Sequence, residues 1–74
     1  MELLEAQKKI LVAYKLQGGQ GVIGDARKAA GVTAADRFVR PLVKGGLLLN
    51  PTRDSYKLTP EGFTVANKLI EQGY

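Results

Sequence analysis

The sequence predicts a single mainly helical domain with a small β-hairpin, an α+β fold in the order α-β-α-α-β-β-α over residues 1–74. Three observations lead to this prediction. Apolar residues recur at helical spacing in three segments, glycine or proline residues separate the segments, and two short apolar runs flank a turn-forming sequence. A chain of 74 residues with 45% hydrophobic and 24% charged residues has the composition of one small globular domain.

The first element is a helix from Glu2 to about Gln17 with one buried face. Its apolar face consists of Leu3, Leu4, Ile10, Leu11 and Tyr14. Val12 and Leu16, four residues apart, fall on the opposite side among charged residues. They are interpreted either as scattered surface hydrophobic residues or, together with Tyr74 in the last helix, as contacts of a homodimer.

Glycine residues mark the ends of the elements in the next segment. Residues 18–21, Gly-Gly-Gln-Gly, end the first helix because glycine readily adopts the left-handed conformation found there. Val22 and Ile23 are expected to form a very short strand. Asp25 then caps a short helix over residues 26–30, which Gly31 ends.

A third helix, residues 34–44, is predicted with Thr33 as its N-cap. Its apolar residues are Ala35, Phe38, Val39, Leu42 and Val43, and they share one side of the helix. The opposite side carries a basic stripe, defined here as Arg37, Arg40 and Lys44, with Thr33 at its start. Pro41 removes one backbone hydrogen bond from the helix, so a kink is expected there.

The C-terminal third predicts a hairpin and a helix. Residues 47–49 and 56–58 are the strands, and Arg53 lies in the connecting loop. Thr59 is a hydroxyl cap followed by proline and glutamate, which together signal the start of a helix over residues 60–72.

The net charge of +4 is concentrated in the middle of the chain. Between Ala26 and Lys57 there are seven Lys or Arg residues against two Asp residues, whereas the rest of the chain has four against five acids. Such a basic segment indicates either a polyanionic partner or a solvated positive surface.

Several classes of function are excluded by composition. Cysteine and histidine are absent, so disulfides, zinc clusters and the usual nucleophilic constellations are not expected. We expect no enzyme activity, no cofactor and no metal, and no small-molecule ligand is evident. No apolar run is long enough to span a bilayer and the N-terminus does not have the order of a secretory signal, so a cytoplasmic protein without membrane contact is expected.

Three stretches carry a resemblance to a known family: DARKAAGVTAADRFV from Asp25, LVKGGLLL from Leu42 and YKLTPEG from Tyr56. Together, in this order, the stretches resemble the winged helix-turn-helix DNA-binding domains of small prokaryotic and archaeal regulators. The resemblance implies that helix 34–44 enters the major groove and that the wing, residues 47–58, lies on the backbone or in the minor groove. The implied DNA contacts are Thr33, Arg37, Arg40, Lys44, Arg53 and Lys57.

The function expected from these observations is duplex-DNA binding by a small, nucleoid-associated transcriptional regulator. A homodimer is expected, because two-fold pairing would double a small footprint on DNA. The alternative is a winged-helix module that binds protein and not DNA, since a fold by itself does not define a function.

Overall fold

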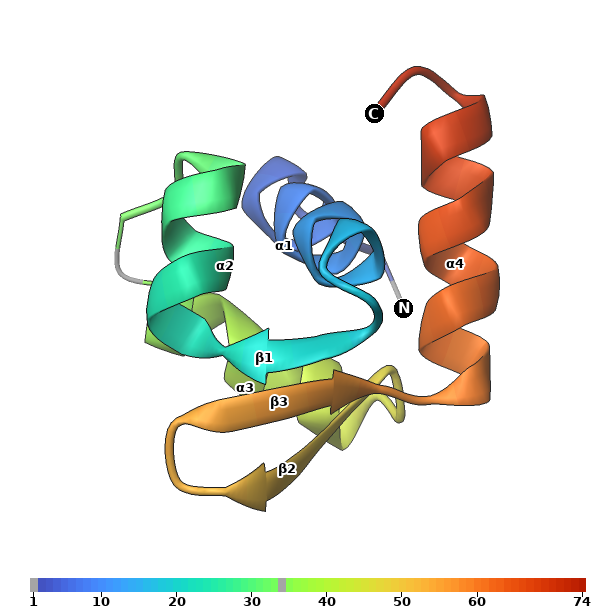
Figure 1. Ribbon diagram of the computed structural model, residues 1–74. Coiled ribbons are helices and arrows are strands. Elements are labelled where there is room, and N and C mark those ends of the chain that lie inside the picture. Colours follow the sequence, from blue (N-terminus) through green and yellow to red (C-terminus); the bar gives the residue numbers. More distant parts are fainter. Residues whose placement is uncertain (1, 34) are drawn as a thin grey trace.

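A computed structural model of the protein describes residues 2–33 and 35–74. Over these ranges the chain is mainly helical with a small three-stranded antiparallel sheet, an α+β fold. The elements are helix α1 (Glu5–Leu16), strand β1 (Gln20–Val22), helices α2 (Ile23–Ala30) and α3 (Ala35–Lys44), strands β2 (Leu48–Thr52) and β3 (Ser55–Leu58), and helix α4 (Pro60–Glu71) (Figure 1). Their order is the predicted one. None of these described helices combines the length and the hydropathy needed to cross a bilayer.

The sheet has the strand order β1-β3-β2, and both neighbours run antiparallel to β3. The predicted hairpin is therefore present as β2 and β3, and β1 adds a third strand beside β3, with Gly21 opposite Tyr56. The N–H of Ile23 donates to the carbonyl of Asp54 at 2.8 Å. This bond holds the start of α2 against the turn end of the hairpin.

Helix α1 lies at the centre of the molecule, with α2, α3, α4 and the sheet around it (Figure 1). Residues 10–14 are all buried. Successive helical residues point about 100° apart, so a helix covered on one face only could not bury five in a row. The placement of Val12 on the surface was therefore wrong: Val12 is 7% exposed, because α2 and α4 both pack on α1. Leu16, one turn further on, is 75% exposed.

Helix α2 begins earlier than predicted, at Ile23, and the short strand before it is shifted to Gln20–Val22. The predicted cap, Asp25, is instead an exposed residue of the first turn, where its charge lies near the positive end of the helix dipole. No side-chain cap is formed at Val22. The physical reason is that the hairpin already accepts a hydrogen bond from the first N–H of the helix. Gly31 ends the helix in the left-handed conformation, with φ 66°.

Helix α3 runs through Pro41 in one piece. Its predicted first residue, Ala34, lies outside the described residues. Because proline has no N–H, the carbonyl of Arg37 loses its helical donor. The helix nevertheless continues, and the N–H of Gly45 donates to the Pro41 carbonyl at 2.8 Å. Arg37 and Pro41 are both exposed, so water can reach the interrupted position; a bend there stays a prediction.

Helix α4 begins with the predicted cap. The hydroxyl of Thr59 accepts a hydrogen bond from the N–H of Gly62 at 3.0 Å, and Pro60 occupies the first helical position. The same hydroxyl donates to the carbonyl of Gly46 at 2.6 Å. Gly62 leaves no room for a side chain, because a Cβ atom there would overlap the carbonyl oxygen of Leu47. The start of α4 therefore packs directly against the segment that joins α3 to β2.

Candidate nucleic-acid interface

The basic stripe of α3 faces solvent. Arg37, Arg40 and Lys44 are exposed, and their spacing makes them project from one side of the helix. Among the described residues the only ion pair joins Lys8 and Glu5, so no described carboxylate lies within 4 Å of a basic group of the stripe. Thr33, which precedes the helix, is exposed as well. The stripe is therefore available to a ligand.

The hairpin presents Arg53 at its turn. A two-residue turn, Arg53-Asp54, connects β2 to β3. The side-chain amide of Asn50 donates to the carbonyls of Thr52 at 2.5 Å and Ser55 at 2.7 Å. These bonds span the irregular part of the β2–β3 pairing. Arg53 is exposed, so its guanidinium extends from a turn whose backbone is anchored on both strands.

A hollow of about 550 Å³, called here the α3–hairpin hollow, lies between α3 and the hairpin. Arg40 and Lys44 line it from α3, and Arg53 lines it from the turn. Half-buried apolar and aromatic side chains complete the walls: Ile23, Val43 and Tyr56. Three cations from two separate elements thus converge on one concavity, and this arrangement favours a ligand with several negative charges.

Two acidic residues also line this hollow, and neither is among the contacts predicted from the sequence. They are Asp36 from α3 and Asp54 from the hairpin turn, so the five charged side chains of the hollow carry a net charge of +1. Asp36 precedes Arg40 by four residues, the spacing at which helical side chains meet. That spacing, and the position of Asp54 next to Arg53, are the sequence signals that could have indicated the acidic contribution.

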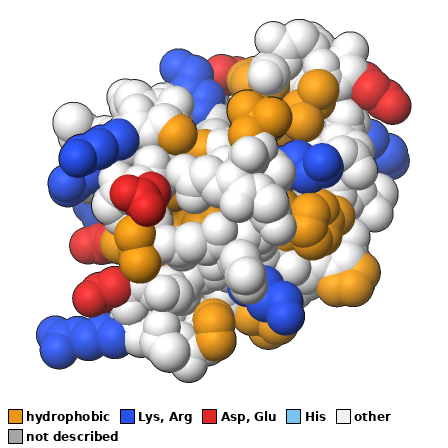
Figure 2. All heavy atoms as spheres, viewed as in Figure 1, with side chains coloured by type: hydrophobic (Ala, Val, Ile, Leu, Met, Phe, Trp, Pro, Cys, Tyr) orange, Lys and Arg blue, Asp and Glu red, His pale blue; other side chains and the backbone are white. Residues whose placement is uncertain are grey.

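The remaining predicted contacts lie outside the hollow. Lys57 is exposed between half-buried Tyr56 and buried Leu58, so it projects from the outer face of the sheet. Arg37 and Thr33 are exposed but are not part of the hollow's lining. Figure 2 shows basic side chains along the edge of the molecule, over α2 and the turn end of the hairpin, with acidic side chains between them.

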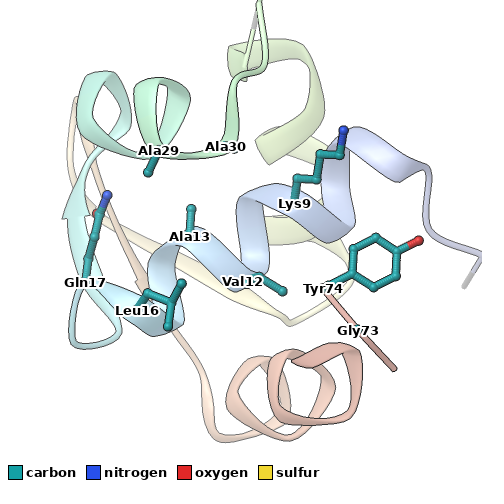
Figure 3. A pocket seen from close by; sticks show the side chains of 9 residues that line it. All are labelled: Lys9, Val12, Ala13, Leu16, Gln17, Ala29, Ala30, Gly73 and Tyr74. Atoms are coloured by element: carbon teal, nitrogen blue, oxygen red, sulfur yellow. The ribbon is translucent and has the colours of Figure 1, made fainter. Parts of the chain in front are cut away.

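A second hollow, of about 440 Å³, is formed by α1, the end of α2 and the C-terminal residues, and is called here the α1–α2 hollow (Figure 3). It brings together the residues assigned to a homodimer, Val12, Leu16 and Tyr74. The Tyr74 hydroxyl donates to the carboxylate of Glu5, and the amine of Lys8 lies 5.6 Å from the Tyr74 ring centre. The hydrogen bond to Glu5 raises the pKa of the Tyr74 phenol above its ordinary value.

No protein-family model, curated protein or solved structure matches this chain. Three of the six DNA contacts implied by the sequence line the α3–hairpin hollow.

Proposed function

We propose that the protein is a winged helix-turn-helix domain that binds duplex DNA without a cofactor and acts as a small transcriptional regulator. The order of the elements supports this fold: α2, a left-handed turn at Gly31 and α3 form a helix-turn-helix, and a hairpin follows. In this assignment α3 is the recognition helix and the β2–β3 hairpin is the wing. The sequence resemblance points to the same roles.

The observation that carries the proposal is the convergence of Arg40, Lys44 and Arg53 on the α3–hairpin hollow. The major groove admits one helix and has a phosphate backbone on each side. With α3 in the groove, Lys44 and Arg53 would meet phosphates of the flanking strand from two directions. Phosphate contacts of this kind set the position of a protein on DNA and supply much of its affinity.

The two acids of the hollow restrict how DNA can lie there. Carboxylates repel phosphates, so Asp36 and Asp54 must face base edges or water when the cations contact the backbone. Aspartate can accept a hydrogen bond from the amino group of cytosine in the major groove. Asp36, in the first turn of α3, is placed on the helix that would carry base contacts.

The chemistry of each predicted contact residue indicates whether it would contact a base or the DNA backbone. An arginine can donate two hydrogen bonds to guanine, so Arg37 and Arg40 are the candidates for base contacts. Thr33 and Lys44 suit phosphate oxygens. Arg53 in the wing is expected to contact the backbone or the minor groove, with Lys57 on the outer face of the sheet as a further backbone contact.

Fluorescence anisotropy with a labelled duplex of about 20 base pairs tests the proposal at several salt concentrations. The logarithm of the affinity should fall with the logarithm of the salt concentration, by about 0.9 for each phosphate neutralised. Arg53→Ala should weaken binding evenly across sequences and reduce that slope, whereas Arg37→Ala and Arg40→Ala should cost about 1–3 kcal/mol on a selected site. Lys68→Ala, an exposed change on α4, is the matched control.

Two results would contradict the proposal. The first is an absence of salt-dependent binding to any duplex at micromolar protein. The second is equal binding by the wild type and the Arg37→Ala/Arg40→Ala double variant. Either result would favour the alternative, in which the domain binds a protein partner.

A further inference from the structure

The α1–α2 hollow lies on the opposite side of α1 from the proposed DNA contacts. Lys9 and Leu16 line the hollow, whereas Gln7 and Tyr14 precede them by two residues each and so point about 160° away around the helix. Gln7 and Tyr14 instead face α3 and the sheet. The Gln7 amide donates to the carbonyl of Phe38 in α3 at 3.3 Å, and the Tyr14 ring packs edge-on against another ring of β3 with centroids 6.4 Å apart.

The hollow combines an apolar projection with an apolar concavity on one face. Leu16 is 75% exposed at its rim, more than any other large hydrophobic side chain among the described residues. Most of the lining is apolar, and its alanines allow a close approach: Ala13, Ala29 and Ala30. Figure 3 shows α1 crossing between α2 and the C-terminal segment, with Tyr74 near one end of the hollow and Gln17 near the other.

A projection beside a cavity is self-complementary under two-fold symmetry. In an isologous interface each copy presents the same patch, so Leu16 of one copy enters the hollow of its partner while the partner's Leu16 enters the first hollow. Lys9 is the one charged residue in the lining, and its flexible stem allows the amine to remain in water at the rim. Pairing therefore requires no charged side chain of the described lining to be buried.

The surface area that two molecules of this size can bury limits the affinity between them. The molecule measures 30 × 23 × 23 Å and exposes 4685 Å² in all. A small specific interface buries about 600 Å² on each partner, which is close to one whole face of a molecule of this size. We therefore expect a weak, reversible pair, which forms at high local protein concentration such as that on DNA.

We propose that the α1–α2 hollow is the pairing surface between two copies of this chain and that the pair joins two duplexes. The second part rests on the proposed function. Because the hollow and the α3–hairpin hollow lie on opposite sides of α1, two-fold pairing turns the two α3 stripes away from each other. One straight duplex cannot reach both stripes, so each copy holds its own duplex. This differs from the expectation from the sequence, in which two-fold pairing doubles the footprint on DNA.

Sedimentation equilibrium of the full chain, from about 10 µM to 1 mM, tests the pairing without DNA. The wild type should form dimers, and Leu16→Gln should weaken the association at least about tenfold, because a central apolar anchor is lost. Leu4→Gln is the matched control, since Leu4 is 59% exposed just before α1 and belongs neither to the lining of the hollow nor to the proposed DNA contacts. A monomeric wild type, or equal association by the wild type and Leu16→Gln, would overturn the pairing.

Capture of a second duplex tests the joining step. One duplex is fixed on beads, the protein is added, and retention of a free fluorescent duplex is measured. The wild type and Leu4→Gln should retain it, whereas Leu16→Gln should bind the beads yet retain at least about threefold less. A dimer that binds the beads without retaining the second duplex would overturn the opposed arrangement. A dimer that does not bind the beads would overturn the proposed function and leave the pairing surface standing.

A ligand of another kind is distinguished by NMR. If the wild type stays monomeric and decanoate shifts the methyl signals of Leu16 and Ala30, the hollow binds a small amphipathic acid and the pairing proposal is wrong.

Discussion

The hydroxyl of Thr59 donates a hydrogen bond of 2.6 Å to the carbonyl of Gly46, thirteen residues earlier in the chain. This bond joins the first residues of α4 to the turn that follows α3. Because the turn also leads into β2, it sets how the hairpin leaves the end of α3. Lys44 from α3 and Arg53 from the hairpin both line the α3–hairpin hollow, so we expect its shape to depend on this junction.

Loss of the Thr59 hydroxyl should therefore destabilise the protein. Thr59→Ala removes both the cap on the Gly62 N–H and the bond to Gly46, and we expect a loss of about 1–2 kcal/mol in the free energy of unfolding. Urea denaturation followed by circular dichroism measures it. Thr59→Ser keeps the hydroxyl and should stay within about 0.5 kcal/mol of the wild type; an equal loss in both variants would contradict the role of the two hydrogen bonds.

Two glycines in helices should respond in opposite directions to the same change. Gly62→Ala places a methyl group against the Leu47 carbonyl, so α4 must shift, at an expected cost of about 1–3 kcal/mol in the free energy of unfolding. At Gly24 in α2 an added Cβ meets nothing within 4 Å, so Gly24→Ala should stabilise the protein by about 0.5–1 kcal/mol. Thermal and urea unfolding of both variants measure these changes. An unchanged free energy of unfolding in Gly62→Ala would show that α4 can move away from the Leu47 carbonyl without loss of stability.

The buried Tyr14 hydroxyl has no hydrogen-bond partner among the described residues. Burial, with smaller contributions from Tyr56 and Asp25, raises the pKa of Tyr14 above its ordinary value of 10.0. The unfolded chain therefore loses this proton first, and the resulting loss of stability begins as the pH rises through about 10. Tyr14→Phe should be neutral or up to about 1 kcal/mol stabilising at pH 7, because no hydrogen bond is lost.

Above pH 10 the free energies of unfolding of the wild type and of Tyr14→Phe should diverge. The free energy of unfolding of the wild type should fall relative to Tyr14→Phe by up to about 1.4 kcal/mol per pH unit. Urea denaturation of both proteins between pH 8 and 11 measures the difference. A difference that does not change with pH would show that the Tyr14 phenol ionises equally well in the folded and unfolded chains.

Removal of the acids from the α3–hairpin hollow should strengthen DNA binding if the cations there contact phosphates. Asp36→Asn or Asp54→Asn raises the net charge of the lining from +1 to +2. A unit charge about 8 Å from a phosphate contributes about 0.5 kcal/mol in water, so a twofold gain in affinity is expected. Fluorescence anisotropy at low salt measures it, with Glu71→Gln on α4 as the control. Weaker binding by Asp36→Asn on a selected site would show instead that Asp36 contacts a base.

Local chemistry made part of the fold predictable from sequence. The start of α4 follows from a hydroxyl, a proline and an acid in adjacent positions, and the end of α2 follows from one glycine that takes a positive φ at Gly31. The turn between the strands follows from residues that favour turns, and it holds Arg53 as expected. These features depend on residues a few positions apart, so the sequence contains all the information they need.

The tertiary structure decided the rest, because each remaining feature depends on segments far apart in the chain. Val12 lies on the polar side of an amphipathic pattern yet is buried, since α4 packs over α1 from more than forty residues away. Asp25 is not a cap because the hairpin supplies the acceptor for the start of α2. Both hollows, and the acids in one of them, exist only where separate elements meet. The pattern of apolar and charged residues determined which residues could be exposed, and the packing of the helices determined which of them share a site.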